Sequence, residues 1–278
     1  MHTFAHCFKF MKKALSILVL LIVFNSCNDF QKAMKSEDTA LKFELGTELY
    51  DAKKYKKANR LFEQIVPKYR GKPQAEKLMF MHADCFFQLE QYYLSAYRFE
   101  QFVNSYPNSE KVEEAAFLSA KSYYEESPIY SKEKEETVKA IEKLQLFINS
   151  YPDSKYLQEV NVLVKELDYK LEKKAFEIAK QYNRIYDYKA SIKSFNNFLL
   201  DFPGTSLKED ALYYRFNSEY NLAILSIKEL KQDRINIALA DYRALVSAYP
   251  NTKYLDEANR LKEELEREKN LTDTDTKS

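Results

Sequence analysis

A four-residue motif recurs four times along the chain and limits what it can fold into. Each copy has an aromatic residue, a proline and two small or polar residues, and the prolines lie 45, 51 and 47 residues apart. Proline cannot continue a helix interior, and Ser, Thr, Asn or Asp behind it can cap a new helix. The motif therefore predicts a repeated unit of helix, stop, cap and helix. The copies are Tyr106-Pro107-Asn108-Ser109, Tyr151-Pro152-Asp153-Ser154, Phe202-Pro203-Gly204-Thr205 and Tyr249-Pro250-Asn251-Thr252, with a weaker first copy ending at Pro67.

Composition supports helices throughout. The 278 residues include only three Gly and seven Pro, and no segment shows the alternation of apolar and polar residues that is typical of strands. A period of this length favours a repeat array over separate compact domains. We therefore predict an all-α protein, and a non-repetitive helical bundle is the alternative.

Small and large apolar residues recur at fixed offsets within each unit. In the first unit they are Gly46, Leu49, Tyr55, Ala58, Phe62 and Ile65. This spacing resembles a tetratricopeptide repeat, in which short side chains let two antiparallel helices approach closely. The resemblance implies an α-solenoid of about five helix-turn-helix repeats over residues 39–265. The polar residues 266–278 are predicted to be a disordered tail.

The N-terminus has the pattern of an export signal. Met11-Lys12-Lys13, the better of two start sites, opens an apolar run from Ala14 to Phe24, which is too short to span a bilayer. Cys27 follows at the expected cleavage point, so residues 1–26 resemble a bacterial lipoprotein signal peptide. We expect a lipid on Cys27 and a tether over residues 27–38. The alternative is an ordinary cleaved signal beside a lone thiol.

The chain offers little material for catalysis. His82 is the only histidine after the signal, and Cys85 lies three residues further along the same helix, which we interpret as a core thiol beside a histidine at the rim. No phosphate-binding or dinucleotide-binding glycine motif is present. We therefore expect no enzyme activity, no metal and no cofactor. The net charge of +1 gives no reason to expect nucleic acid as a partner.

Aromatic residues recur at two offsets in the first helices of the repeats. In tetratricopeptide arrays these offsets line the concave groove, so the resemblance implies a groove that binds peptides with aromatic or aliphatic anchors. The alternative is that these rings pack between adjacent helices. The predicted groove residues are Phe43, Tyr50, Phe80, Phe87, Phe117 and Tyr124, and Phe176 and Tyr213 continue the first offset.

The lipoprotein signal and the five repeats with their closing motif together resemble the BamD (ComL/YfiO) family of outer-membrane assembly lipoproteins. The resemblance covers the chain from Met11 to about Leu265. It implies a lipid-anchored scaffold on the periplasmic face of the outer membrane. Its expected partners are a BamA-like barrel-forming subunit and unfolded outer-membrane proteins, which carry an aromatic C-terminal signal. The alternative is a tetratricopeptide lipoprotein that regulates cell-wall synthesis or nutrient uptake.

Overall fold

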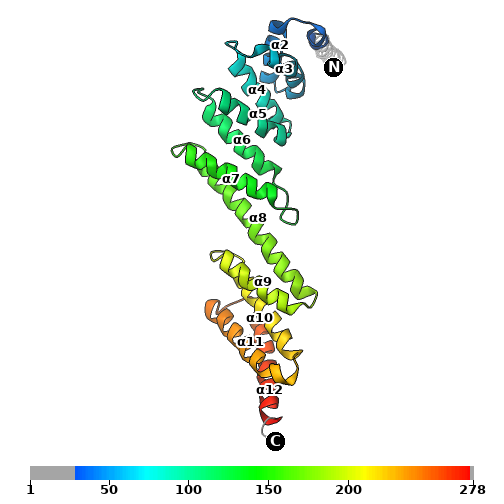
Figure 1. Ribbon diagram of the computed structural model, residues 1–278, viewed down its shortest axis with the longest axis vertical. Coiled ribbons are helices and arrows are strands. Elements are labelled where there is room, and N and C mark those ends of the chain that lie inside the picture. Colours follow the sequence, from blue (N-terminus) through cyan, green and yellow to red (C-terminus); the bar gives the residue numbers. More distant parts are fainter. Residues whose placement is uncertain (1–28, 276–278) are drawn as a thin grey trace, which may run out of the picture. The chain divides into compact units, whose positions relative to one another are not determined.

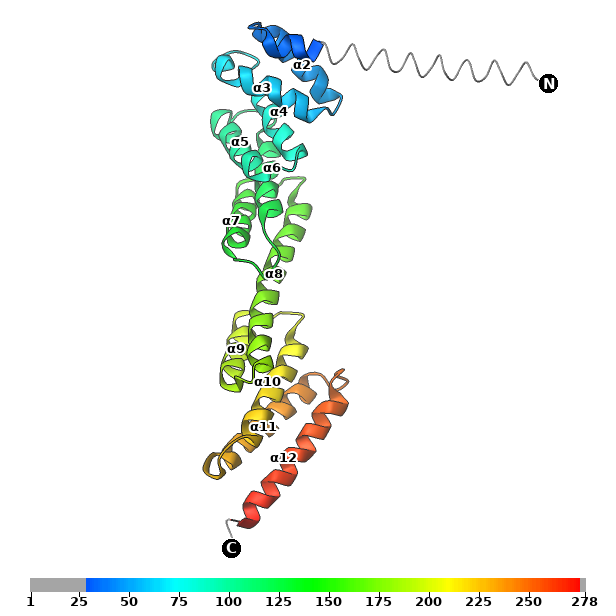
Figure 2. The same cartoon turned by 90° about the vertical axis from the view of Figure 1, so that its right-hand side faces the viewer.

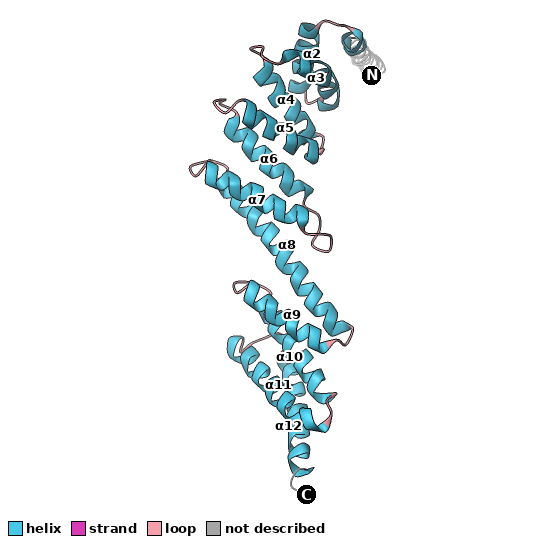
Figure 3. Cartoon of the chain, in the orientation of Figure 1, coloured by secondary structure: helices cyan, strands magenta, loops and turns pink. Residues whose placement is uncertain are grey.

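The computed structural model describes residues 29–275, and these residues contain helices and no strand (Figures 1 and 3). Residues 29–35 are helical, and consecutive helices after them pack in pairs. The all-α prediction is thus confirmed. The labelled helices are α2 (Thr39–Asp51), α3 (Tyr55–Tyr69), α4 (Ala75–Gln88), α5 (Tyr92–Ser105), α6 (Val112–Glu126), α7 (Glu135–Ser150), α8 (Leu157–Arg184), α9 (Tyr188–Asp201), α10 (Lys208–Ile224), α11 (Lys228–Ala248) and α12 (Leu255–Asp275).

The chain divides into two compact units. The first contains the described residues up to Ser127 together with Glu135–Val164, and the second contains Pro128–Lys134 and the described residues from Lys165 onward. In the first unit, α2, α4 and α6 are the first helices of their repeats, and neighbouring members of this set contact each other. In the second unit, α9, α10, α11 and α12 pack in sequence. Figure 2 shows the same elements after a quarter turn.

The four motif copies lie between helices, as their sequence predicts. They follow α5, α7, α9 and α11, and the Ser or Thr hydroxyl of each accepts a hydrogen bond from the backbone N–H two residues later, as in Lys111 N–H to Ser109 Oγ at 3.0 Å. The weaker first copy differs, because Pro67 lies within the last turn of α3.

These hydroxyls do not cap the helices as predicted, because the N-caps of α6 and α10 are Lys111 and Leu207, two residues further on, and the hydroxyl bonds lie in the turns before the helices. Three of the hydroxyls also connect neighbouring repeats. Ser109 Oγ donates to Glu76 Oε1 at 2.5 Å, which joins the start of α6 to the start of α4. Ser154 donates to Glu113 at 2.6 Å, and Thr252 to Glu209 at 2.6 Å. The motif therefore both ends one helix and fastens the next repeat to the one before it.

The glycine of the first repeat shows why small residues are needed at this offset. A Cβ atom on Gly46 would lie 2.5 Å from Cε1 of Phe62, which is far closer than two carbon atoms can approach. Phe62 is fully buried in the core of this repeat. The side-chain-free face of Gly46 thus lets α2 and α3 come together.

Two predicted boundaries need correction. Phe30 is 3% exposed and packs with Ala33 into the first core, so residues 29–35 are part of the folded chain and not of a tether. At the other end, α12 continues through most of the predicted tail. Lys231 on α11 pairs with Glu268 at 3.0 Å, and such contacts hold residues that composition alone assigned to disorder.

The predicted signal peptide and Cys27 lie outside the described residues. Within residues 29–275, no helix has the length and apolar character needed to cross a membrane.

Candidate peptide-binding site

The rings at the first predicted offset belong mainly to the helical core. Phe80 on α4 is 9% exposed, and its ring meets Phe99 and Phe102 of α5 edge to face at 5.6 and 5.5 Å. Phe117 on α6 is also buried, against Phe147. Phe176 and Tyr213 are buried in the same way in the second unit. The alternative interpretation of these rings, packing between adjacent helices, therefore describes this offset better than an open groove.

In three repeats, the residue two positions after the motif lies over the ring at the first offset of the preceding helix pair. Tyr156 stacks on Phe117 with a centroid distance of 4.2 Å, and Tyr254 stacks on Tyr213 at 3.8 Å. These covering residues come from the next turn between repeats, so the contact joins one repeat to its neighbour. The signal for it is present in the sequence, two residues beyond each Ser or Thr of the motif.

In the second repeat the covering residue is a lysine. Lys111 places its ammonium group 5.2 Å from the centroid of the Phe80 ring and pairs with Glu114 at 2.7 Å. A flexible, half-exposed side chain leaves space that a tyrosine would fill. Phe80 consequently borders an open pocket instead of lying under a second ring.

This pocket, which we call the Tyr50–Phe80 pocket, has a volume of about 380 Å³. It lies between the end of α2, the start of α4 and the turn before α6. Its rim carries both charge signs, and its floor is aromatic and aliphatic. The residues that line it are Tyr50, Asp51, Pro73, Glu76, Lys77, Phe80, Met81, Phe102 and Lys111.

The Tyr50 ring is fixed in place by a buried carboxylate. Its hydroxyl donates to Asp84 Oδ2 at 2.5 Å, and Gln88 donates to the other oxygen of Asp84 at 3.2 Å. Burial, followed by the hydrogen bond to Asp84, raises the pKa of Tyr50 above its usual value. Tyr50 therefore stays protonated and presents a ring with fixed orientation, which limits the entropy lost when a ligand packs against it.

The other predicted groove residues are not all part of this pocket. Phe43 is half-buried and stacks on Tyr69 at 5.4 Å, and Phe87 is half-buried and meets Tyr92 edge to face at 5.6 Å. Tyr124 is half-buried on α6. Of the six predicted residues, the structure thus brings Tyr50 and Phe80 together at one pocket.

His82 and Cys85 lie on the same helix, and both are buried. Cys85 is fully covered, and burial raises its thiol pKa. His82 is 3% exposed, so the expected position at a rim is wrong. Among the described residues, no group of three or more His, Cys, Asp or Glu side chains is arranged to hold a metal ion.

Paired helices, small residues at close crossings and a repeated hydrogen bond between neighbouring repeats define a tetratricopeptide-like helical repeat protein, a class that presents surfaces for binding. Over residues 35–234 the chain matches the model of the YfiO family, described as outer membrane lipoprotein. The chain therefore belongs to the YfiO family of outer membrane lipoproteins. Comparison with curated proteins found no significant match.

Proposed function

We propose that this protein is a lipid-anchored periplasmic scaffold of the outer-membrane β-barrel assembly machinery. In this role it binds a BamA-like barrel-forming subunit and captures unfolded outer-membrane proteins through their aromatic C-terminal residues. Family membership supports the general role. The Tyr50–Phe80 pocket supports the capture of precursors.

The observation that carries the proposal is a pocket lined both by the fixed ring of Tyr50 and by the ring of Phe80, which is 9% exposed. Two rings and Met81 in the lining suit a large apolar side chain, because rings give much contact area with few rotatable bonds. Lys77 and Lys111 at the rim can pair with a chain-terminal carboxylate. An aromatic residue at the C-terminus of a peptide carries both groups.

The surface next to the N-terminal end supports membrane anchoring. Cys27 lies two residues before the first described helical residue, and Phe30 borders a second hollow near the start of α3. Four lysines and an arginine surround this hollow, all exposed except the half-buried Lys57, and their charge suits the phosphate groups of a lipid surface. The basic residues are Lys53, Lys54, Lys56, Lys57 and Arg60.

The pocket can be tested by closing it. The change Lys111→Tyr places the side chain found at the equivalent position of two other repeats, Tyr156 and Tyr254, over the Phe80 ring. We expect a stable fold and roughly tenfold weaker binding of a short peptide that ends in a free Phe carboxylate, equivalent to about 1.4 kcal/mol. Fluorescence anisotropy with a labelled peptide measures the change.

A matched control is Tyr93→Ala, because Tyr93 is 72% exposed on α5 and does not line the pocket. This variant should bind the peptide like the unchanged chain. If Lys111→Tyr binds the peptide as tightly as the unchanged chain, the Tyr50–Phe80 pocket is not the site of capture.

The partners are tested by purifying the protein from its native membranes in mild detergent and identifying the proteins that co-purify. A barrel-forming subunit with periplasmic repeat domains is the expected dominant partner. Recovery of cell-wall synthases or nutrient transporters without such a barrel would contradict the proposed role and favour the alternative function.

A further inference from the structure

A second kind of pocket occurs twice in the first unit, at equivalent places in successive repeats. One copy lies between α3 and α5 over α4, with a volume of about 350 Å³, and the other lies between α5 and α7 over α6, with about 330 Å³. We call them the α3–α5 pocket and the α5–α7 pocket. The residues that line the two pockets can be paired by aligning the repeats. Alignment on the motif prolines pairs Arg98 with Lys143 and Tyr106 with Tyr151, and alignment on Phe80 and Phe117 pairs Met79 with Ala116 and His82 with Ser119.

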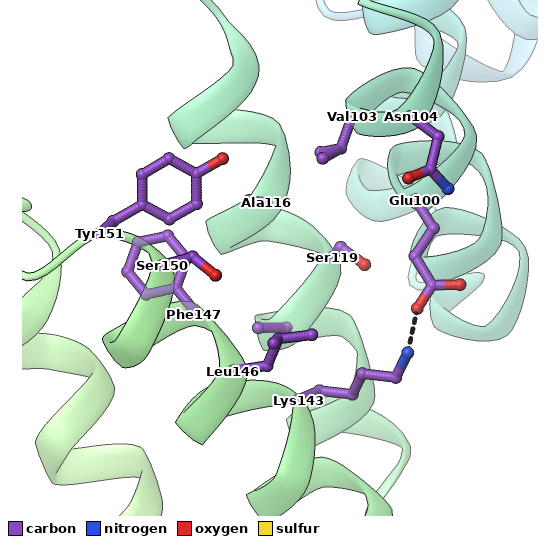
Figure 4. Close-up of a pocket in the computed structure, with 11 residues that line it drawn as sticks. Glu100, Val103, Asn104, Ala116, Ser119, Lys143, Leu146, Phe147, Ser150 and Tyr151 are labelled. Atoms are coloured by element: carbon purple, nitrogen blue, oxygen red, sulfur yellow. Dashed lines mark hydrogen bonds and ion pairs between the residues drawn. The ribbon is translucent and has the colours of Figure 1, made fainter. Parts of the chain in front are cut away.

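In the α5–α7 pocket the charged side chains pair with each other (Figure 4). Lys143 Nζ lies 2.5 Å from Glu100 Oε1, and Tyr123 donates a second hydrogen bond to this carboxylate at 3.1 Å. Ser119 Oγ donates to the carbonyl of Ala96 at 3.2 Å. The cation and the floor hydroxyl of this pocket therefore both have partners within the chain.

The α3–α5 pocket carries a cation without such a partner. Arg98 contacts the amide oxygen of Gln101 at 3.0 Å, but within the described part of the chain its guanidinium has no carboxylate partner and its buried Nε atom has no hydrogen bond. Glu63, the counterpart of Glu100, is exposed and does not line the pocket. Arg70 adds a second guanidinium, and the lining contains no acidic residue.

His82 lines this pocket and also has a ring nitrogen without a hydrogen-bond partner. Its Nε2 atom is buried and has no hydrogen-bond partner among residues 29–275. Burial, helped by nearby Arg98, lowers the pKa of His82 to about 4, so the ring is neutral near pH 7. A buried polar atom without a partner destabilises the unliganded state, and a ligand that supplies the partner recovers this free energy.

We propose that the α3–α5 pocket binds a carboxylate side chain, presented by an acidic segment of a partner polypeptide. The planar guanidinium of Arg98 can hold two carboxylate oxygens at once, and His82 Nε2 in its protonated tautomer can donate to one of them. Val66 and Met79 provide apolar walls for the methylene groups of a glutamate. This site is separate from the Tyr50–Phe80 pocket and does not depend on the capture of precursors.

The test is an NMR titration of the full chain with N-acetyl-glutamate N-methylamide, observed at the His82 ring signals, which are identified by their loss in His82→Gln. We expect a saturable shift. Arg98→Gln should weaken binding roughly tenfold or more, because it removes the charge-assisted hydrogen bonds to the carboxylate. Arg98→Lys should lose part of the affinity, because it keeps the charge without the two-pronged geometry.

The matched control is Lys143→Gln, which removes the equivalent cation from the α5–α7 pocket and should leave the titration unchanged. Equal binding of the glutamine analogue, or no shift with the glutamate probe, would overturn the proposal. A shift produced by inorganic phosphate and not by the glutamate probe would also overturn it, because the ligand would then be a phosphate group. Retained His82 signals in unliganded Arg98→Gln show that the variant is folded.

Discussion

The change Ser109→Ala tests whether the repeated motif fastens one repeat to the next. Ser109 Oγ accepts the N–H of Lys111 at 3.0 Å and donates to Glu76 at 2.5 Å, so alanine removes both a hydrogen bond within the turn before α6 and an inter-repeat bond. Loss of the bond within the turn costs about 1 kcal/mol. The bond to the carboxylate adds about 1 kcal/mol, since Glu76 is half-exposed and can be resolvated. The expected loss of stability is therefore about 2 kcal/mol.

The assay combines urea unfolding with hydrogen exchange of the amides in α4 and α6. A loss of about 2 kcal/mol corresponds to roughly thirtyfold faster exchange where opening is local. The double-mutant cycle with Glu76→Ala, which removes the acceptor, isolates the bond between repeats, and we expect a coupling free energy of about 1 kcal/mol. Ser105→Ala is the matched control, because Ser105 is exposed near the end of α5, and it should change stability by less than about 0.5 kcal/mol.

Two results would refute this reasoning. If Ser109→Ala is no more destabilising than Ser105→Ala, the two hydrogen bonds of the Ser109 hydroxyl contribute nothing measurable. If the cycle with Glu76 gives no coupling while the single change is costly, the serine acts within its own turn and does not connect the repeats.

Three further predictions concern other parts of the chain. Gly46→Ala should destabilise the first repeat by about 1–3 kcal/mol in a urea titration, because the new methyl group collides with Phe62. Burial raises the pKa of Glu219 from 4.5 to about 7, so the folded state holds a proton that the unfolded chain releases, and stability falls as pH rises from about 4.5 through 7. Glu219→Gln should flatten this dependence between pH 5 and 8, with an effect of at most about 3 kcal/mol. Cys27→Ser should move the protein from the membrane fraction to the soluble periplasmic fraction, as followed by immunoblotting, and persistent membrane attachment would contradict the lipid anchor.

The sequence predicts the architecture well because the repeated motif acts locally. Proline ends a helix, and a Ser or Thr hydroxyl bonds the backbone of the turn before the next one, so both effects can be inferred from the local sequence without knowing the tertiary contacts. The close approach at Gly46 follows from the same local pattern. The helical tail to Asp275 could not be inferred in this way, because its residues are held by contacts with α11, such as Lys231 with Glu268.

The positions of the aromatic residues within each repeat do not predict which rings border a pocket. Phe80 and Phe117 occupy equivalent positions, yet Phe117 lies under Tyr156 and Phe80 borders a pocket beside Lys111. Burial at this offset depends on a residue more than thirty positions later in the sequence. A helical pattern read within one repeat does not contain that information, whereas alignment of the turns between repeats does.

The second repeat departs from its neighbours on two sides of one helix. Phe80 and His82 are two residues apart on α4, which places their side chains about 200° apart around the helix axis. The Phe80 ring lies under Lys111, where two other repeats have a tyrosine ring. His82 lies near Arg98, which lacks the carboxylate partner that Lys143 has in the next repeat. The buried nitrogen atoms His82 Nε2 and Arg98 Nε have no hydrogen-bond partner among the described residues, so a ligand that supplies one recovers free energy. A helix with an open site on each side also gives two ligands a common rigid support, so binding at the Tyr50–Phe80 pocket and at the α3–α5 pocket can occur at the same time.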